Sequence, residues 1–171
     1  MGVYLKVLLK AVVVSDGVCW QCVERCLEEL INFFDVQGSV ALVDLPGYGW
    51  AKVPKSVQAS WGRTIQGYLE DRLQLKLAIL LVDIRRKPGV EELNLLDWFT
   101  MQDRHCLIVA TKADKVPKSQ RAKAIKALSV AFGVATRDIV PFSTLTKEGR
   151  DTIWSTIFAL TQAAAKNSAQ P

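Results

Sequence analysis

The segment 44–47 (Asp-Leu-Pro-Gly) contains the residue types that a phosphate and metal site needs, and it directly follows an apolar run, 40–43. A carboxylate such as that of Asp44 can hold Mg²⁺, usually through water. Gly47 has no side chain, so a backbone N–H can approach a phosphate closely there. Ligands of open α/β sheets bind beyond the carboxyl ends of the strands. We therefore expect a phosphate-binding turn at the end of a buried strand.

Two later segments could bind a purine base. Thr111-Lys112-Ala113-Asp114 follows the apolar run 107–109, and Ser143-Thr144 follows 139–142. A carboxylate accepts two N–H bonds from guanine, which adenine cannot offer, and the Lys112 stem can lie along the ring. Backbone N–H groups at Ser143 and Thr144 could meet the guanine oxygen. Each segment alone is more often a plain surface turn, but the three in order predict a guanine nucleotide site.

These side chains need a scaffold that brings several strand ends together. From residue 31 onward, short apolar runs alternate with longer segments of helical periodicity, which favours an α/β fold with a mainly parallel sheet. The expected strands are 31–36, 40–45, 77–82, 106–110 and 139–142, the first two forming an antiparallel hairpin. The expected helices are 54–73, a segment after Pro88-Gly89, 118–132 ended by Gly133, and 147–165 with Ile153, Trp154 and Ile157 inward.

Length and charge set broad limits. The chain has 171 residues, enough for one domain with a sizeable core, and its net charge of +5 permits contact with RNA. Ordinary cytosolic proteins are often this basic, so charge alone does not decide the partner. No apolar stretch reaches the length of about 18 residues that a membrane helix requires. We expect a cytoplasmic protein without a membrane partner.

The cysteines and the histidine suggest no catalytic centre. Cys19, Cys22 and Cys26 could supply three thiolate ligands to a metal, but no nearby fourth ligand completes the set. We interpret them as reduced cysteines on a short helix. His105 opens a strand, which favours a structural role.

Residues 30 to 160 resemble the EngB (YihA) family of small bacterial GTPases. The resemblance rests on the segments 30–34, 43–55, 81–85, 111–115, 141–144 and 147–149, of which the extended Pro-Gly-Tyr-Gly-x-Ala block at 46–51 is the most specific. It implies a Ras-like three-layer α/β sandwich over residues 30–165, binding of GTP and GDP with Mg²⁺, and assistance in assembly of the large ribosomal subunit. Proteins of this family are also linked to septum formation and cell division. The likeness implies a monomer that contacts ribosomal RNA, and a mobile switch at 48–55.

The resemblance also implies the individual site residues. Asp44 would hold Mg²⁺ through water, Gly47 would sense the γ-phosphate, and Lys112 and Asp114 would bind guanine. Thr111 stands where many GTPases carry Asn. The full set implied to bind GTP is Asp44, Leu45, Pro46, Gly47, Thr111, Lys112, Ala113, Asp114, Phe142, Ser143 and Thr144. Asp83 and Arg85 follow a buried strand, and we expect them to organise the neighbouring loop.

Residues 1–29 depart from the family. It carries a phosphate-binding P-loop there, yet no Gly-x-x-x-x-Gly-Lys-[Ser/Thr] motif occurs in this chain. The P-loop supplies most of the phosphate-binding N–H groups, so we expect nucleotide affinity to fall by orders of magnitude. Codons for Val18-Cys19-Trp20, read one base on, permit Phe-Ala-Gly, the usual lead-in to that loop. A shifted reading frame upstream of residue 30 and a divergent N-terminus are both open interpretations.

The apolar residues between 3 and 14 could still form the missing central strand. Residues 15–17 would then turn into a helix over 19–29, which would restore a βαβ-like outline with a turn too short to wrap phosphates. The alternative is a disordered start and a weakened sheet. We expect the tail 166–171 to fray.

Three functional hypotheses follow. The first is a GTP-binding protein of the EngB type with impaired nucleotide binding, and whether it hydrolyses GTP stays open. The second is a non-enzymatic module whose basic residues contact ribosomal RNA. The third is an inactive fragment.

Overall fold

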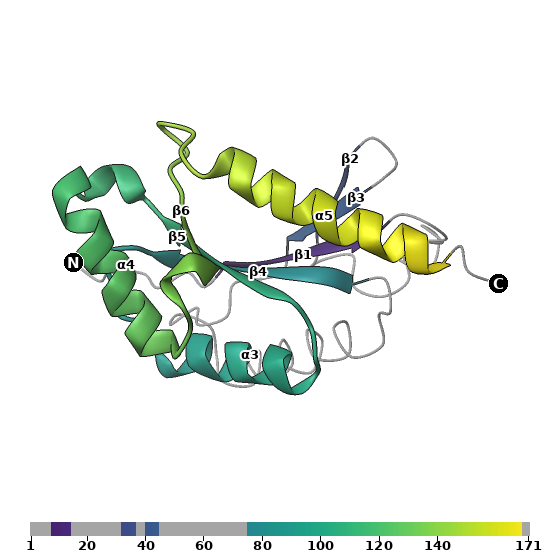
Figure 1. Cartoon of the computed structure of the whole chain (residues 1–171), viewed down its shortest axis with the longest axis horizontal. Coiled ribbons are helices and arrows are strands. Elements are labelled where there is room, and N and C mark those ends of the chain that lie inside the picture. The colour runs from purple at the N-terminus through teal and green to yellow at the C-terminus, as the bar shows by residue number, and fades with distance from the viewer. Residues whose placement is uncertain (1–7, 15–31, 37–39, 45–74, 169–171) are drawn as a thin grey trace.

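The computed structural model describes residues 8–14, 32–36, 40–44 and 75–168, which form a six-stranded sheet with helices against both faces (Figure 1). The strands are β1 (Leu8–Val14), β2 (Asn32–Val36), β3 (Val40–Asp44), β4 (Leu75–Asp83), β5 (Cys106–Thr111) and β6 (Ile139–Pro141). Their spatial order is β2-β3-β1-β4-β5-β6. The helices are α3 (Val90–Met101), α4 (Lys118–Phe132) and α5 (Arg150–Ser168), with short 3₁₀ turns η1 (Ala113–Lys115) and η2 (Thr136–Asp138).

The strands β4, β5 and β6 run parallel to one another. The predicted β2–β3 hairpin is confirmed and is antiparallel. Because β3 and β4 are both antiparallel to the strand between them, β3 runs in the same direction as β4. Four of the six strands therefore end at one edge of the sheet, which agrees with the predicted α/β fold.

The first strand fills the central position between β3 and β4, which agrees with the interpretation of residues 3–14 as the missing central strand. β1 is antiparallel to both neighbours, with Lys10 opposite Asp44 and Val14 opposite Val40. Its last residue thus lies at the edge where β3 begins. Because β2 is also antiparallel to β3, β1 runs in the same direction as β2, the next strand in the chain, which is the relation that a βαβ unit requires. The turn and the helix predicted between them, at 15–29, lie outside the described residues.

Alternate residues of the central strands enter two cores. On one face, Leu80, Val82 and Ile108 pack with Leu96 of α3 and with Leu128 and Phe132 of α4. On the other face, Leu77, Ile79 and Val109 pack with Ile153, Trp154 and Ile157 of α5, as predicted. A strand buried on both faces must be apolar at successive positions, which explains the continuous apolar sequences of β4 and β5.

The ends of two helices follow simple backbone chemistry. Glu92 is buried and accepts a 2.7 Å hydrogen bond from the Gly89 N–H at the start of α3. Gly133 ends α4 in the left-handed conformation (φ 68°), as expected for a glycine at this position.

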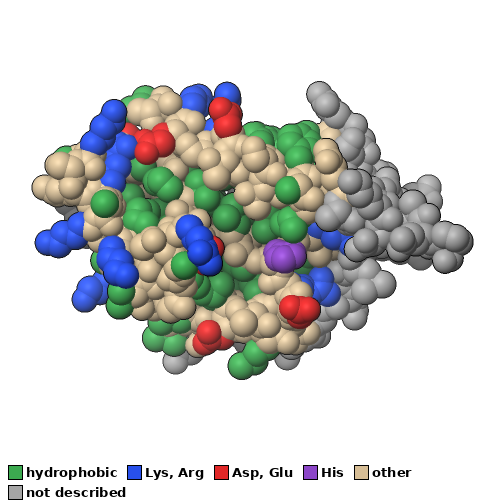
Figure 2. Space-filling view, in the orientation of Figure 1, with side chains coloured by type: hydrophobic (Ala, Val, Ile, Leu, Met, Phe, Trp, Pro, Cys, Tyr) green, Lys and Arg blue, Asp and Glu red, His purple; other side chains and the backbone are tan. Residues whose placement is uncertain are grey.

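Several sequence predictions lie outside the described residues. These are the turn at 15–17 and the helix over 19–29 with the cysteines at 19, 22 and 26, the turn and switch at 45–55, and the helix over 54–73. Within the described part, burial raises the pKa of the Cys106 thiol to about 12, so it stays protonated. His105 is exposed just before β5, where Figure 2 shows it near the middle of the visible face. None of the helices in the described residues is long and apolar enough to cross a membrane.

Candidate functional site

The carboxyl ends of β4, β5 and β6 bring three polar loops together at one edge of the sheet. Asp83 pairs in register with Thr111, and Ala110 pairs with Pro141, so these strands end at similar levels. The loop after β5 contains Lys112 and Asp114, and the loop after β6 contains Ser143. Asp83, the loop 111–114 and Ser143, which are far apart in the sequence, therefore lie at the same edge of the sheet.

An acidic side chain at the end of β4 holds two cations. Arg85 donates to Asp83 through Nε (2.9 Å), Nη2 (2.7 Å) and its backbone N–H (3.0 Å). The Lys112 ammonium lies 3.1 Å from the second carboxylate oxygen. The Arg85 hydrogen bonds, opposed in part by desolvation and helped by Lys112, hold the pKa of Asp83 well below its usual range. The expectation that Asp83 and Arg85 organise this loop agrees with this geometry.

The backbone of the 111–114 loop is held in a tight turn. The Thr111 hydroxyl donates to the Val82 carbonyl (2.9 Å), and the Ile84 N–H donates to the Thr111 carbonyl (3.0 Å). Lys112 adopts a left-handed conformation (φ 61°), which non-glycine residues enter at a cost. Ala113 is buried, and its N–H donates to the Phe142 carbonyl (3.0 Å). Thr111 thus ties this loop to β4 instead of standing free at the surface.

Asp114 and Ser143 form the centre of the site. The buried Ser143 hydroxyl donates to Asp114 Oδ1 (2.7 Å) and accepts from the N–H groups of Leu145 and Thr146 (3.2 Å each). This hydroxyl bond, opposed in part by desolvation, lowers the pKa of the Asp114 carboxyl. At neutral pH Asp114 is therefore an ionised acceptor held in one orientation.

The loop after β6 is closed by contacts that the sequence motifs did not reveal. The Ser143 N–H donates to the Glu148 carbonyl (3.2 Å), and the Glu148 carboxylate pairs with Arg121 of α4 (2.5 Å). Gly149 has φ 79°, and a Cβ at that position would lie 2.1 Å from the Pro141 carbonyl oxygen. A glycine is required where the chain passes this close to β6. The sequence feature that could have predicted this closed loop is Lys-Glu-Gly at 147–149.

Asp44 lies apart from this group, on the other side of β1. Asp44 is paired in the sheet with Lys10 of β1, and Lys10 is paired in turn with Ile79 of β4. Asp44 lines a cavity of about 260 Å³ whose walls include Phe34, Phe142 and Trp154. The described residues hold no cluster of three or more His, Cys, Asp or Glu side chains that could ligate a metal. A single carboxylate fits Mg²⁺ where phosphates and water supply the other ligands.

The structure thus brings together six of the predicted residues through contacts of their two loops with each other and with β4: Thr111, Lys112, Ala113, Asp114, Phe142 and Ser143. Thr144 is exposed beside them. Leu45, Pro46 and Gly47 lie outside the described residues. The pairing of Asp83 with Lys112 is a contact that sequence reasoning missed.

The chain is similar to known proteins over most of its length. It is 46% identical over 132 residues to a probable GTP-binding protein EngB from Geobacter sulfurreducens, which covers 77% of this chain and 64% of that one. It is 44% identical over 140 residues to a probable GTP-binding protein EngB from Geobacter metallireducens, which covers 82% and 69%. The chain therefore spans about two thirds of the length of these relatives. No protein-family model matches it.

The fold also has a solved counterpart. A crystal structure of a probable GTP-binding protein engB superposes with a TM-score of 0.67 at 19% identity, covering 81% of this chain and 86% of the other. At this identity the likeness concerns the fold.

Proposed function

The chain belongs to the EngB family of GTP-binding proteins, and from that premise we propose that it binds GTP and GDP chiefly through the guanine base, at the ends of β5 and β6. The observation that carries this proposal is the ionised Asp114 carboxylate held by the buried Ser143 hydroxyl. A fixed anion at a sheet edge suits a base that offers two adjacent N–H donors. Adenine lacks this pair of donors.

Each neighbouring residue has a role in the proposed contact. Asp114 accepts the two guanine N–H groups, and the stem of Lys112 lies along the ring. The Ser143 N–H already donates to Glu148, so the contact to the guanine oxygen falls to the Thr144 N–H. Thr111, Ala113 and Phe142 shape the loop through their hydrogen bonds, and their side chains make no polar contact with the base.

The phosphate end of the site is weaker in this proposal. The sequence contains no P-loop motif. The last residue of β1 lies at the edge where β3 begins, so a loop that follows β1 starts at the edge opposite to the candidate site. Asp44 would hold Mg²⁺ through water, with Leu45, Pro46 and Gly47 next to the phosphates; the ion supplies positive charge against them. We infer a nucleotide affinity well below that of a GTPase with its P-loop, and we assign no hydrolysis step.

The cellular role that we propose is assistance in large ribosomal subunit assembly, with an effect on septum formation and cell division. It rests on family membership and on a basic surface. Figure 2 shows Lys and Arg side chains gathered at the end of the molecule where α4 lies. The same surface supports a second candidate function, a non-enzymatic module that contacts ribosomal RNA without nucleotide.

The test is a titration of a fluorescent GDP analogue against the wild-type chain and an Asp114→Ala variant. Loss of two charge-assisted hydrogen bonds, worth about 3 kcal/mol together, predicts roughly hundredfold weaker binding. Asp138→Ala, at an exposed position outside the site, removes the same charge and is the control. Equal affinity of all three folded proteins would overturn the proposed site.

A further inference from the structure

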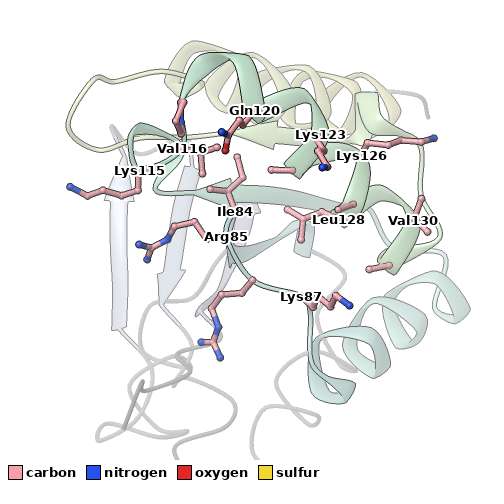
Figure 3. Close-up of a pocket in the computed structure, with 15 residues that line it drawn as sticks. Ile84, Arg85, Lys87, Lys115, Val116, Gln120, Lys123, Lys126, Leu128 and Val130 are labelled. Atoms are coloured by element: carbon pink, nitrogen blue, oxygen red, sulfur yellow. The ribbon is translucent and has the colours of Figure 1, made fainter. Parts of the chain in front are cut away.

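A groove runs between the loop after β4 and helix α4, beside the candidate site. Its volume is about 1220 Å³. Figure 3 shows two rims, one from the β4–α3 loop and the end of η1, and the other from α4. On α4 the lining positions Gln120, Lys123, Ala127 and Val130 recur at helical spacing, so one helix face forms that wall. The groove is therefore an open channel and not a gap within the core.

The charged residues that the structure describes along this groove are all positive. The charged residues that line it are Arg85, Arg86, Lys87, Lys115, Lys123 and Lys126, and no Asp or Glu occurs among the described lining residues. Helix α4 contains no acidic residue at all. Arg85 forms an ion pair with Asp83, and Lys115 forms one with Asp114. In the described part of the chain no carboxylate forms an ion pair with the other four cations.

A concave wall of like charges focuses an electric field more than a flat basic surface does. The base of the groove is apolar, with the buried residues Ile84 and Leu128 beneath it. None of the described lining residues is aromatic, so this part of the groove wall has no side chain on which a base could stack. An aromatic side chain of a protein partner would also meet no aromatic side chain among the described lining residues. These features favour a polyanion recognised by its backbone.

We propose that this basic groove binds the sugar–phosphate backbone of folded RNA without reading its sequence. The proposal rests on the proposed role in ribosome assembly and specifies which surface makes that contact. Phosphates lie against Lys123 and Lys126 on one rim and against Arg86 and Lys87 on the other. The groove begins next to the guanine site, because Arg85 lines the groove and is hydrogen-bonded to Asp83. The four cations that we assign to the phosphates are not part of the guanine site.

The experiment measures binding of a fluorescent RNA hairpin of about 16 base pairs, the length that shape-reading domains span. The test variant is Lys123→Gln/Lys126→Gln, which keeps good helix formers on α4. The control variant, Lys118→Gln/Arg137→Gln, removes the same charge at exposed positions outside the groove. Loss of two phosphate contacts should lower the slope of log affinity against log salt by roughly two and weaken binding at least about tenfold at low salt.

The control variant should keep most of the wild-type affinity, and hairpins of different sequence should bind alike. Equal weakening in both variants would overturn the proposal, because net charge alone would then explain binding. Tighter binding of a poly-glutamate peptide than of the hairpin would also overturn it, in favour of an acidic protein partner. Titration of GDP on the same variants separates the two proposals, since a failed guanine site leaves RNA binding by the groove intact.

Discussion

At the scale of single residues, the site depends on one buried hydroxyl. Ser143 joins the loop after β6 to the loop after β5, because its oxygen serves two backbone donors and its proton serves Asp114. The neighbouring Thr144 is exposed. Two adjacent hydroxyl residues therefore differ in what they contribute.

Ser143→Ala should destabilise the domain by about 2 kcal/mol, because two backbone N–H groups and a carboxylate lose a buried partner. Thr144→Ala should change stability by less than about 0.5 kcal/mol. Urea denaturation followed by circular dichroism measures both. Equal effects of the two substitutions would show that the Ser143 hydroxyl is not the link between these loops.

The stability should also depend on pH through Asp83. Its folded-state pKa lies below its unfolded value of about 3.9, so its stabilisation is present above that pH and is lost as the pH falls below it. Asp83→Asn should cost about 1 kcal/mol at pH 6, and the gap to wild type should narrow progressively as the pH falls below about 3.9.

The control for that measurement is Asp97→Asn, which removes an equal charge at an exposed position on α3. It should follow the wild-type curve. A gap for Asp83→Asn that stays constant from pH 6 to low pH would mean that the ionised pair with Arg85 and Lys112 is not its cause.

Sequence alone could predict the main residues of the site but not their partners. Asp114 and Ser143 stand just beyond apolar runs, and parallel strands end at one edge, so their proximity follows from the pattern. The ion pair of Asp83 and Lys112 joins the last residue of β4 to the loop after β5, and no spacing in the sequence encodes it. Its geometry depends on the register between β4 and β5.

At the scale of elements, two glycines carry different constraints. Gly133 and Gly149 both have positive φ, but a Cβ at Gly133 would meet nothing within 4 Å, whereas at Gly149 it would collide with Pro141. Gly133→Ala should therefore cost only the left-handed backbone energy, about 1 kcal/mol. Gly149→Ala should cost about 3 kcal/mol, because the chain beside β6 must also move.

Thermal or urea unfolding of both variants checks this difference. The pair is matched, since each change adds one methyl group to a left-handed glycine. Similar losses for the two would contradict the close approach of the 147–149 segment to β6.

The direction of β1 could not be predicted from its sequence. Its sequence, Leu-Leu-Lys-Ala-Val-Val-Val, is apolar at every position except Lys10, as is typical of a central strand. Such a pattern predicts burial but contains no information on parallel or antiparallel pairing. The other strands were predicted within a few residues because turn or helix signals bound them.

Nuclear Overhauser contacts between backbone protons can test this direction. The antiparallel register predicts contacts of Val14 with Val40 and of Lys10 with Asp44. Contacts between Leu8 and Val40 would instead show a parallel strand, and a phosphate-binding turn after β1 would then again be possible at the site edge.

At the scale of the whole molecule, the two ends of the proposed nucleotide site are unequal. The guanine end is built on three parallel strand ends with fixed polar contacts. On the phosphate side, Asp44 is separated from β4 by a strand of opposite direction. The base should therefore supply most of the binding energy, and each added phosphate should contribute little.

The most direct test of this account is isothermal titration of guanosine, GMP, GDP and GTP, each with Mg²⁺. We predict dissociation constants within about tenfold of one another, a spread of about 1.4 kcal/mol, and no detectable binding of ADP. Binding of GDP about a thousandfold tighter than guanosine would contradict the account, because it would mean that this chain holds phosphates as strongly as it holds the base. Failure of all four ligands to bind a folded protein would contradict it as well.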